Sequence, residues 1–214
     1  SGEVMVPLTG AYNAMNAAQA AAAAAVAGIA WETILGSMGS LTAPPGRLEP
    51  VPGGESGAGP RVFVDYAHTD DALDRMLAAV APLVPSGGRL VAVFGCGGDR
   101  DRTKRPRMAA AAARHADLVI LTSDNPRTED PERILDDIAA GVPSAGGPEV
   151  RREVDRGRAI RLAVELAGPA DVVVIAGKGH ERDQILGTQR RPFHDVEVAR
   201  AALLEAAEPR ESSP

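Results

Sequence analysis

The sequence has little of what marks secreted, membrane-spanning or nucleic-acid-binding proteins. One cysteine, Cys96, in 214 residues excludes an internal disulfide and fits a reducing compartment. No apolar stretch reaches the ~20 residues of a transmembrane helix, and the alanine-rich run at 17–30 lacks the basic lead-in of a signal peptide. Lys and Arg are scattered and the net charge is −6. We therefore expect a cytoplasmic protein with neither a nucleic-acid nor a membrane partner.

Aromatic residues make up only 3% of the chain, so Ala, Val, Leu and Ile must build its core. The segment from Thr9 to Gly28 contains strong helix formers, and we expect Thr9 or Asn13 to cap a helix there. A low-complexity alanine tract is the alternative interpretation. A second short helix is expected at 31–38. Residues 44–60 are dense in Pro and Gly, which predicts a linker between two units.

From residue 61 onward, runs of Val, Ile and Leu alternate with helix-forming segments. This alternation predicts an α/β, Rossmann-like domain over 61–208, with a mostly parallel sheet covered by helices on both faces. A short additional strand is expected at 184–186, and the tail 209–214 is expected to be disordered. The main strand-like runs are 61–66, 89–94, 117–123, 149–154 and 171–177.

Four of these runs end in loops rich in polar side chains. The loops read DYAHTDD, GCGGDRDRTKRP, SDNPRTED and GKGHERD. In a parallel sheet, loops that follow the strands meet at one edge, and open α/β sheets bind their ligands at that edge. The sequence therefore predicts that all four loops contribute to a single site.

Several short stretches resemble known functional motifs but do not match them. GCGGDR is not a dinucleotide fingerprint because Arg100 stands where the third glycine belongs, and GKGHE is not a P-loop because Gly179 follows Lys178. No G-x-x-x-x-G-K-[ST] occurs in the chain. The four histidines have no metal-binding spacing, so no metal site is expected. We interpret Cys96 as a small apolar loop residue rather than a nucleophile.

The side chains of the loops suit a zwitterionic or polyanionic ligand. Arg100, Arg127 and Lys178 offer donors to a carboxylate or a phosphate. Asp124 and Glu181 can accept hydrogen bonds from an ammonium group. The alternative is that these charges pair with one another at the sheet edge.

Seven motifs occur in one order along nearly the whole chain, from about residue 8 to 204. They are GAYNAMN, PGRLEPV, VDYAHTDDAL, VFGCGGDRDRTKRPRM, SDNPRTEDP, VIAGKGHE and FHDVEVAR. Together they make the chain resemble the C-terminal part of the Mur ligases that add meso-diaminopimelate in peptidoglycan synthesis. Departures such as Tyr12 and Asp70, where the family commonly has Phe and Pro, lie outside the predicted pocket.

The resemblance implies an enzyme that joins UDP-N-acetylmuramoyl-L-alanyl-D-glutamate to meso-diaminopimelate with ATP and Mg²⁺, through an acyl phosphate. It implies that residues 1–43 are the helical tail of a central ATPase domain. We interpret Ser1-Gly2 separately as a cloning scar. Because the P-loop is missing, we expect the chain to be inactive by itself and to hold no cofactor tightly. We also expect a monomer.

The resemblance also assigns roles to individual residues. Arg127 would bind the distal carboxylate of diaminopimelate, helped by Asp124 and Asn125. The amino-acid pocket as a whole would consist of Arg100, Asp124, Asn125, Arg127, Gly177 and Glu181. The predicted ATP contacts are Asn16, Arg47, Asp65 and His68. Two alternatives stay open, namely a non-catalytic amino-acid-binding module and another amide ligase of the superfamily, of the cyanophycin or folylpolyglutamate synthetase type.

Overall fold

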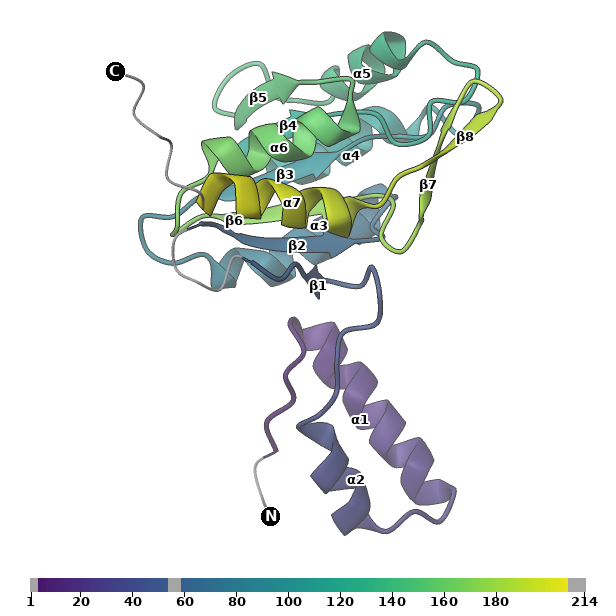
Figure 1. Ribbon diagram of the computed structural model, residues 1–214, viewed down its shortest axis with the longest axis vertical. Helices are drawn as coiled ribbons and strands as arrows, with labels where there is room; N and C mark the ends of the chain where they lie inside the picture. Colours follow the sequence, from purple (N-terminus) through teal and green to yellow (C-terminus); the bar gives the residue numbers. More distant parts are fainter. Residues whose placement is uncertain (1–3, 54–58, 208–214) are drawn as a thin grey trace. The chain divides into compact units, whose positions relative to one another are not determined.

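The computed structural model describes residues 4–53 and 59–207 (Figure 1). The chain divides into two compact units, Ser1–Pro44 and Pro45–Pro214, and each is described by itself. The division falls at the start of the predicted linker, but Glu49–Pro50 within that linker form a strand of the larger unit's sheet, so this unit begins before residue 61. The expectations for Ser1-Gly2, for 54–58 of the linker and for the tail 209–214 lie outside the described residues.

The smaller unit consists of two helices, α1 (Ala11–Val26) and α2 (Trp31–Met38), which confirms both predicted helices. The expected side-chain cap is wrong. The N-cap residue is Gly10, and Asn13 lies inside the first turn, where its Nδ2 donates to the carbonyl of Thr9. The helices pack through Ala17, Ala21, Ile34 and Met38.

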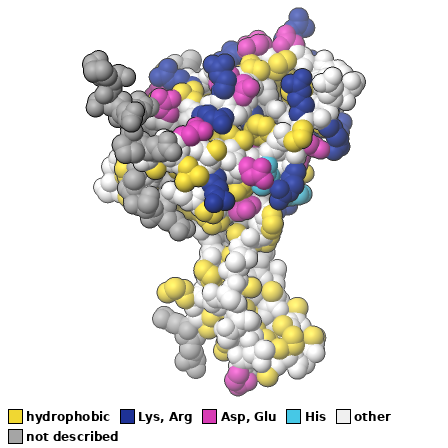
Figure 2. Space-filling view, in the orientation of Figure 1, with side chains coloured by type: hydrophobic (Ala, Val, Ile, Leu, Met, Phe, Trp, Pro, Cys, Tyr) yellow, Lys and Arg dark blue, Asp and Glu magenta, His cyan; other side chains and the backbone are white. Residues whose placement is uncertain are grey.

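The surface of this helical unit is nearly uncharged, since Glu32 is the one charged residue between positions 4 and 44. Large apolar side chains such as Met5 and Trp31 are exposed on it. In the larger unit, basic and acidic side chains are interspersed over the visible face (Figure 2).

The larger unit is built on a six-stranded sheet of order β1-β2-β6-β3-β4-β5. Neighbouring strands from β2 to β5 are all parallel, and β1 alone runs antiparallel, against β2. The mostly parallel sheet confirms the predicted fold class. The strands are β1 (Glu49–Pro50), β2 (Arg61–Asp65), β3 (Leu90–Phe94), β4 (Leu118–Leu121), β5 (Glu149–Arg152) and β6 (Val172–Ala176).

Helices cover both faces of the sheet, as Figure 1 shows. One face carries α3 (Asp70–Val80), the 3₁₀ turn η1 (Ala81–Leu83), α4 (Lys104–Ala113) and α5 (Pro131–Ala139), and the other carries α6 (Arg156–Leu166) and α7 (Asp195–Ala207).

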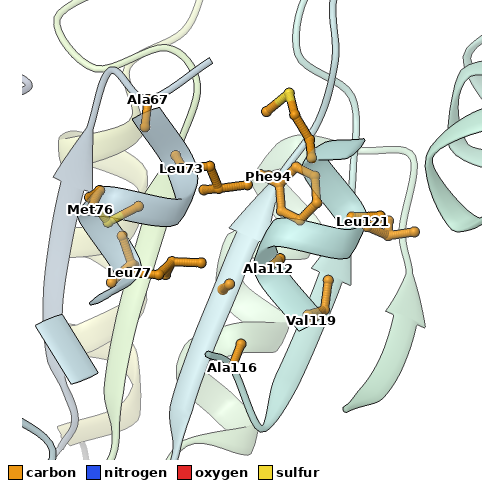
Figure 3. Close-up of a cluster of buried hydrophobic side chains, with 14 of the residues drawn as sticks. Ala67, Leu73, Met76, Leu77, Phe94, Ala112, Ala116, Val119 and Leu121 are labelled. Atoms are coloured by element: carbon orange, nitrogen blue, oxygen red, sulfur yellow. The ribbon is translucent and has the colours of Figure 1, made fainter. Parts of the chain in front are cut away.

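Alternate residues of the central strand β6 enter the two cores. Val172 and Val174 belong to the cluster under α3, α4 and α5, and Val173 and Ile175 to the cluster under α6 and α7. Figure 3 shows part of the first cluster, in which Phe94 is the labelled aromatic residue among aliphatic side chains. A strand buried on both faces reads as a continuous apolar run, which is why β6 was evident in the sequence.

A separate two-stranded hairpin, β7 (Asp183–Leu186) and β8 (Gln189–Pro192), follows β6. The strand expected at 184–186 lies within β7. Strand β8 was not predicted, because its sequence QRRP is polar and all four residues are exposed. One isolated bridge joins Arg127 and Leu186, so the hairpin contacts the loop after β4.

The order of the strands creates a crevice at the carboxyl end of β6. Strands β2 and β3 are followed by helices on one face of the sheet, whereas β6, which lies between them, is followed by α7 on the other face. Loops that leave adjacent strands in opposite directions open a space at the sheet edge, and open α/β folds bind ligands there.

Candidate ligand-binding site

A cleft of about 430 Å³ lies at this edge of the sheet. Residues from the loops after β2, β3, β4 and β6 line it, so the four loops predicted to share a site do meet. The cleft is lined by all six residues of the predicted amino-acid pocket, which are Arg100, Asp124, Asn125, Arg127, Gly177 and Glu181. That they bind an amino acid stays a prediction.

The loops after β3 and β4 are fastened to each other by close backbone approach. The N–H of Gly98 donates to the carbonyl of Asn125 at 2.9 Å. A Cβ at Gly98 would lie 1.9 Å from the carbonyl oxygen of Pro126, and one at Gly95 would lie 2.0 Å from that of Thr122. The glycines of GCGG therefore allow two loops to pack together.

A buried arginine also joins the loops after β3 and β4 through hydrogen bonds. Arg105, at the start of α4, is fully buried and donates to the carbonyl of Gly97 and to the carboxylates of Glu129 and Asp137. The hydrogen bond from Arg105 holds the pKa of Glu129 below its ordinary value, although burial acts in the opposite direction.

Arg127 has a left-handed backbone, with φ 53°, which is uncommon for a residue other than glycine. The β7 hairpin holds it there, because the N–H of Arg127 donates to the carbonyl of Ile185 at 3.1 Å and the N–H of Gly187 donates to the carbonyl of Arg127 at 2.7 Å. Its Nη1 donates to the carbonyl of Gly98 at 2.8 Å. The guanidinium is thus positioned at the cleft by contacts from two loops.

Two carboxylates form the acidic side of the cleft. Burial raises the pKa of Asp124, although the charges of Arg156 and Lys178 act in the opposite direction. Among the described residues, Oδ1 of Asp124 is buried without a hydrogen-bond partner, and the nearest cation, Nζ of Lys178, is 3.6 Å away. Burial also penalises ionised Glu181, but hydrogen bonds from Lys178 and Asn125 outweigh it and lower the pKa of Glu181.

Lys178 does not face the cleft, which corrects the expectation that it offers a donor to the ligand. Its side chain is fully buried, and its Nζ donates to Oε2 of Glu181 at 2.8 Å and to Oδ1 of Asn125 at 3.0 Å. The alternative of charges that pair with one another therefore applies to Lys178. Arg100, in contrast, is exposed at the cleft, where its Nη1 donates to the carbonyl of Asp99 at 3.2 Å.

Tyr66 and Lys104 also line the cleft and were not singled out from the sequence. Nζ of Lys104 donates to the carbonyl of His68 at 2.7 Å. The ring of Tyr66 lies 4.7 Å from the ring of His68 and 5.2 Å from that of His180. Both missed residues stand within the polar stretches DYAHTDD and GCGGDRDRTKRP of the sequence, so their nearness to predicted residues was the available signal.

The predicted nucleotide contacts have different surroundings. Both carboxylate oxygens of Asp65 accept backbone N–H groups, from Leu48 and from Ala67, each at 2.8 Å, so this side chain anchors the chain segment before β1. Burial raises the pKa of Asp65 despite these bonds. The guanidinium of exposed Arg47 lies 4.9 Å from the centroid of the Tyr66 ring.

His68 lines the cleft, and its Nδ1 lies 2.9 Å from the carbonyl of Tyr66. Asn16 belongs to the helical unit, where its Nδ2 donates to Oδ1 of Asn13 at 3.4 Å. Contacts of Asn16, Arg47, Asp65 and His68 with ATP stay predictions.

Cys96 is buried in the loop after β3, and its Sγ lies 3.5 Å from Sδ of Met108. Burial raises the pKa of its thiol to about 12. A nucleophilic cysteine needs the thiolate form, so the interpretation of Cys96 as an apolar loop residue fits its surroundings. Within the described ranges, no three His, Cys, Asp or Glu side chains are grouped to hold a metal ion. No helix in residues 4–53 or 59–207 is long and apolar enough to cross a membrane.

Comparison with known proteins decides the family. Residues 46–179 match the family described as Mur ligase, glutamate ligase domain. The chain belongs to the Mur ligase family. It is 53% identical over 205 residues to the UDP-N-acetylmuramoyl-L-alanyl-D-glutamate–2,6-diaminopimelate ligase of Parasynechococcus marenigrum, covering 95% of this chain and 40% of that protein. The protein of the same name from Synechococcus elongatus is also 53% identical, over 93% of this chain and 39% of the relative.

Solved structures agree with this membership. A structure of a UDP-N-acetylmuramoyl-L-alanyl-D-glutamate–2,6-diaminopimelate ligase has 42% identity and a TM-score of 0.74, and the match covers 96% of this chain and 41% of that one. The UDP-N-acetylmuramate-alanine ligase of Thermotoga maritima, at 16% identity and a TM-score of 0.66, shares the fold over 96% of this chain and 40% of its own. The chain spans about 40% of the length of the curated Mur ligases it matches.

Proposed function

We propose that the full protein adds meso-diaminopimelate to UDP-N-acetylmuramoyl-L-alanyl-D-glutamate with ATP, and that the cleft binds diaminopimelate. The observation that carries this proposal is the composition of the cleft, in which the guanidinium groups of Arg100 and Arg127 stand with the carboxylates of Asp124 and Glu181. Relatives that are 53% identical and bear the name of this ligase support it.

The two charge types match the far end of diaminopimelate, which carries an ammonium and a carboxylate on one carbon. The planar guanidinium of Arg127 suits the carboxylate, because a fork of N–H donors can bind both oxygens. Asp124 and Glu181 also line the cleft, and their carboxylates suit the ammonium. Lysine has the ammonium but no distal carboxylate, so it would leave Arg127 without a carboxylate partner.

Holding the far end in this way presents the other amino group to the reaction. In the proposed reaction, ATP transfers its terminal phosphoryl group to the glutamate carboxylate of the dipeptide and leaves as ADP. The amine then attacks the acyl carbon, and phosphate and a proton are released as the amide forms. The role of this cleft is to select and orient the amine, which is a large part of catalysis for a two-substrate reaction. We assign no group in the cleft to proton transfer.

The nucleotide would contact a different set of residues, which we propose as Asn16, Arg47, Asp65 and His68. Asp65 would act indirectly, because its carboxylate oxygens accept backbone N–H groups. The described residues offer no group of three candidate metal ligands, so we assign none of them to Mg²⁺. We further propose that residues 1–43 belong to an ATPase domain, that 61–208 form the amino-acid-binding domain, and that the protein acts as a cytoplasmic monomer.

Calorimetric titration of the chain with meso-diaminopimelate and with L-lysine tests the proposal. We expect diaminopimelate to bind at least about tenfold more tightly, because lysine leaves the half-buried guanidinium of Arg127 without a carboxylate partner. Arg127→Ala should remove this preference. Arg133→Ala, which removes a guanidinium from an exposed position on α5, should preserve it. Equal affinities for the two amino acids in the unmodified chain would contradict the proposal.

A further inference from the structure

Lys178 is a fully buried cation directly behind the cleft. The chain has 23 cationic side chains, of which only Lys104 and Lys178 are lysine, so the type of this buried residue is unusual for the protein. Its Nζ lies 2.8 Å from Oε2 of Glu181, 3.0 Å from Oδ1 of Asn125 and 3.6 Å from Oδ1 of Asp124. These three partners all line the cleft.

We propose that Lys178 is a positioning residue for the amine substrate, which sets the orientation of Asn125 and the net charge of the acidic side of the cleft without touching the ligand. The identity of the ligand rests on the proposed function. The arrangement of Lys178 and its three partners does not depend on which ligand binds.

The orientation of Asn125 follows from the donors around its oxygen. Oδ1 accepts from Nζ of Lys178 and from the backbone N–H of Ile185, at 3.0 and 2.9 Å. The amide nitrogen is thereby directed to Oε2 of Glu181, to which it donates at 3.0 Å. A rotated amide would turn an N–H group toward two donors and lose all three bonds. Lys178 and the hairpin strand β7 together decide which end of Asn125 faces the acidic side.

The charge of the acidic side follows from its members. Asp124 and Glu181 carry two negative charges when ionised, and Lys178 supplies one positive charge. The neighbouring Arg156 and Asp195 are both fully buried and neutralise each other, with nitrogen–oxygen distances of 2.8 and 2.7 Å. One net negative charge therefore faces the cleft, and it matches one ammonium group. Without Lys178, two carboxylates would share a site with little water, which favours protonation of one of them.

Lysine rather than arginine suits this position. Two hydrogen-bond acceptors and the more distant carboxylate oxygen of Asp124 surround a single nitrogen. An ammonium group has its N–H donors on one atom, whereas a guanidinium spreads its donors over a planar fork. Gly177 and Gly179 flank Lys178 with φ of 115° and 52°. A Cβ at Gly179 would lie 2.7 Å from Cβ of Tyr66. The loop therefore turns tightly on both sides of Lys178, and its side chain enters the interior.

The test compares Lys178→Met and Lys178→Arg with Arg133→Met, which removes one exposed cation from α5. Circular dichroism first identifies the variants that are folded. For the folded ones, we expect the affinity for meso-diaminopimelate to fall about tenfold or more in both Lys178 variants, as for loss of a charged hydrogen bond, and to stay constant in Arg133→Met. An NMR pH titration of the Glu181 carboxyl carbon should show a higher midpoint in Lys178→Met than in the unmodified chain.

The two readouts separate the two ideas. An unmodified chain that does not bind diaminopimelate would contradict the proposed function, while the Glu181 titration would still test Lys178. An unchanged Glu181 midpoint in folded Lys178→Met would overturn the inference, and so would unchanged affinity in both Lys178 variants.

A measurement on the unmodified chain covers the case in which neither Lys178 variant folds. With ¹⁵N-labelled lysine the chain has two ammonium groups, and Lys104→Arg assigns them. We expect the Lys178 ammonium to be visible as a signal protected from exchange with water, and to shift when diaminopimelate binds. An ammonium that exchanges as freely as that of Lys104, or that does not respond to bound ligand, would refute the positioning role.

Discussion

The buried ion pair between Arg156 and Asp195 stabilises the carboxyl ends of the strands beside the cleft, and its contribution can be measured. Both side chains are fully buried, and two nitrogen–oxygen contacts of 2.8 and 2.7 Å join them. Arg156 also donates to the carbonyls of Ser123 and Ala176, at 3.3 and 3.0 Å. These residues directly precede Asp124 and Gly177 at the cleft, so one guanidinium connects the ends of two strands that are not neighbours in the sheet.

We expect Arg156→Met to lower the free energy of unfolding by about 3–5 kcal/mol, because it leaves the buried carboxylate of Asp195 unpaired. A domain of this size is stabilised by roughly 5–15 kcal/mol in total, so the loss is large. The double variant Arg156→Met/Asp195→Leu should regain part of it, since a buried ion pair can often be replaced by apolar residues at little net cost. A remainder of about 1–3 kcal/mol is expected from the two carbonyls that lose their donor.

Urea denaturation at neutral pH, followed by circular dichroism, measures these differences for both single variants and the double variant. Arg75→Met is the matched control, because Arg75 forms an ion pair with Asp71 in which both side chains are largely exposed, at 76% and 71%. Exposed pairs contribute about 0–1 kcal/mol. A cost for Arg156→Met as small as that of Arg75→Met would refute the reasoning that burial makes this pair important.

Four further predictions concern the cleft and its loops. Arg127→Ala in the full-length enzyme should lower kcat/KM for diaminopimelate about a hundredfold through loss of charged hydrogen bonds. Arg127→Lys should retain only part of the original kcat/KM, because lysine lacks the planar fork. Steady-state assays measure both variants. Gly98→Ala should destabilise the protein by roughly 1–3 kcal/mol, seen as a lower melting temperature, because a Cβ would lie 1.9 Å from the carbonyl oxygen of Pro126. Since burial raises the pKa of Asp124, its favourable contribution to stability is present at low pH and is lost as pH rises through the folded pKa. Asp124→Asn should therefore raise the urea midpoint of the ligand-free chain at pH 7, yet weaken diaminopimelate binding in calorimetry. Finally, the chain incubated with ATP, Mg²⁺, the UDP-muramoyl dipeptide and diaminopimelate should release no phosphate above background, because it has no phosphate-cradling P-loop.

Much of the architecture could be predicted because its signals are local. Apolar runs such as those of β3, β4 and β6 are buried on both faces of the sheet, and they stand out in the sequence for that reason. Helix signals were equally local, as at Pro131 in the first turn of α5. The exposed strand β8 had no such signal. The start of α1 was also not evident, because its N-cap is Gly10 and no side chain caps the helix.

The sequence by itself determined that four polar loops share one edge, because every strand of a parallel sheet ends in the same direction. Only the tertiary structure decided which polar side chains face the cleft. Lys178, in the loop after β6, and Asp65, at the end of β2, stand close in sequence to cleft-lining residues. Their side chains instead bind Asn125 and the backbone N–H of Leu48. The position of β6 between β2 and β3 was likewise decided by long-range pairing. Such choices depend on which buried groups satisfy one another's hydrogen bonds and charges, and no local pattern specifies that.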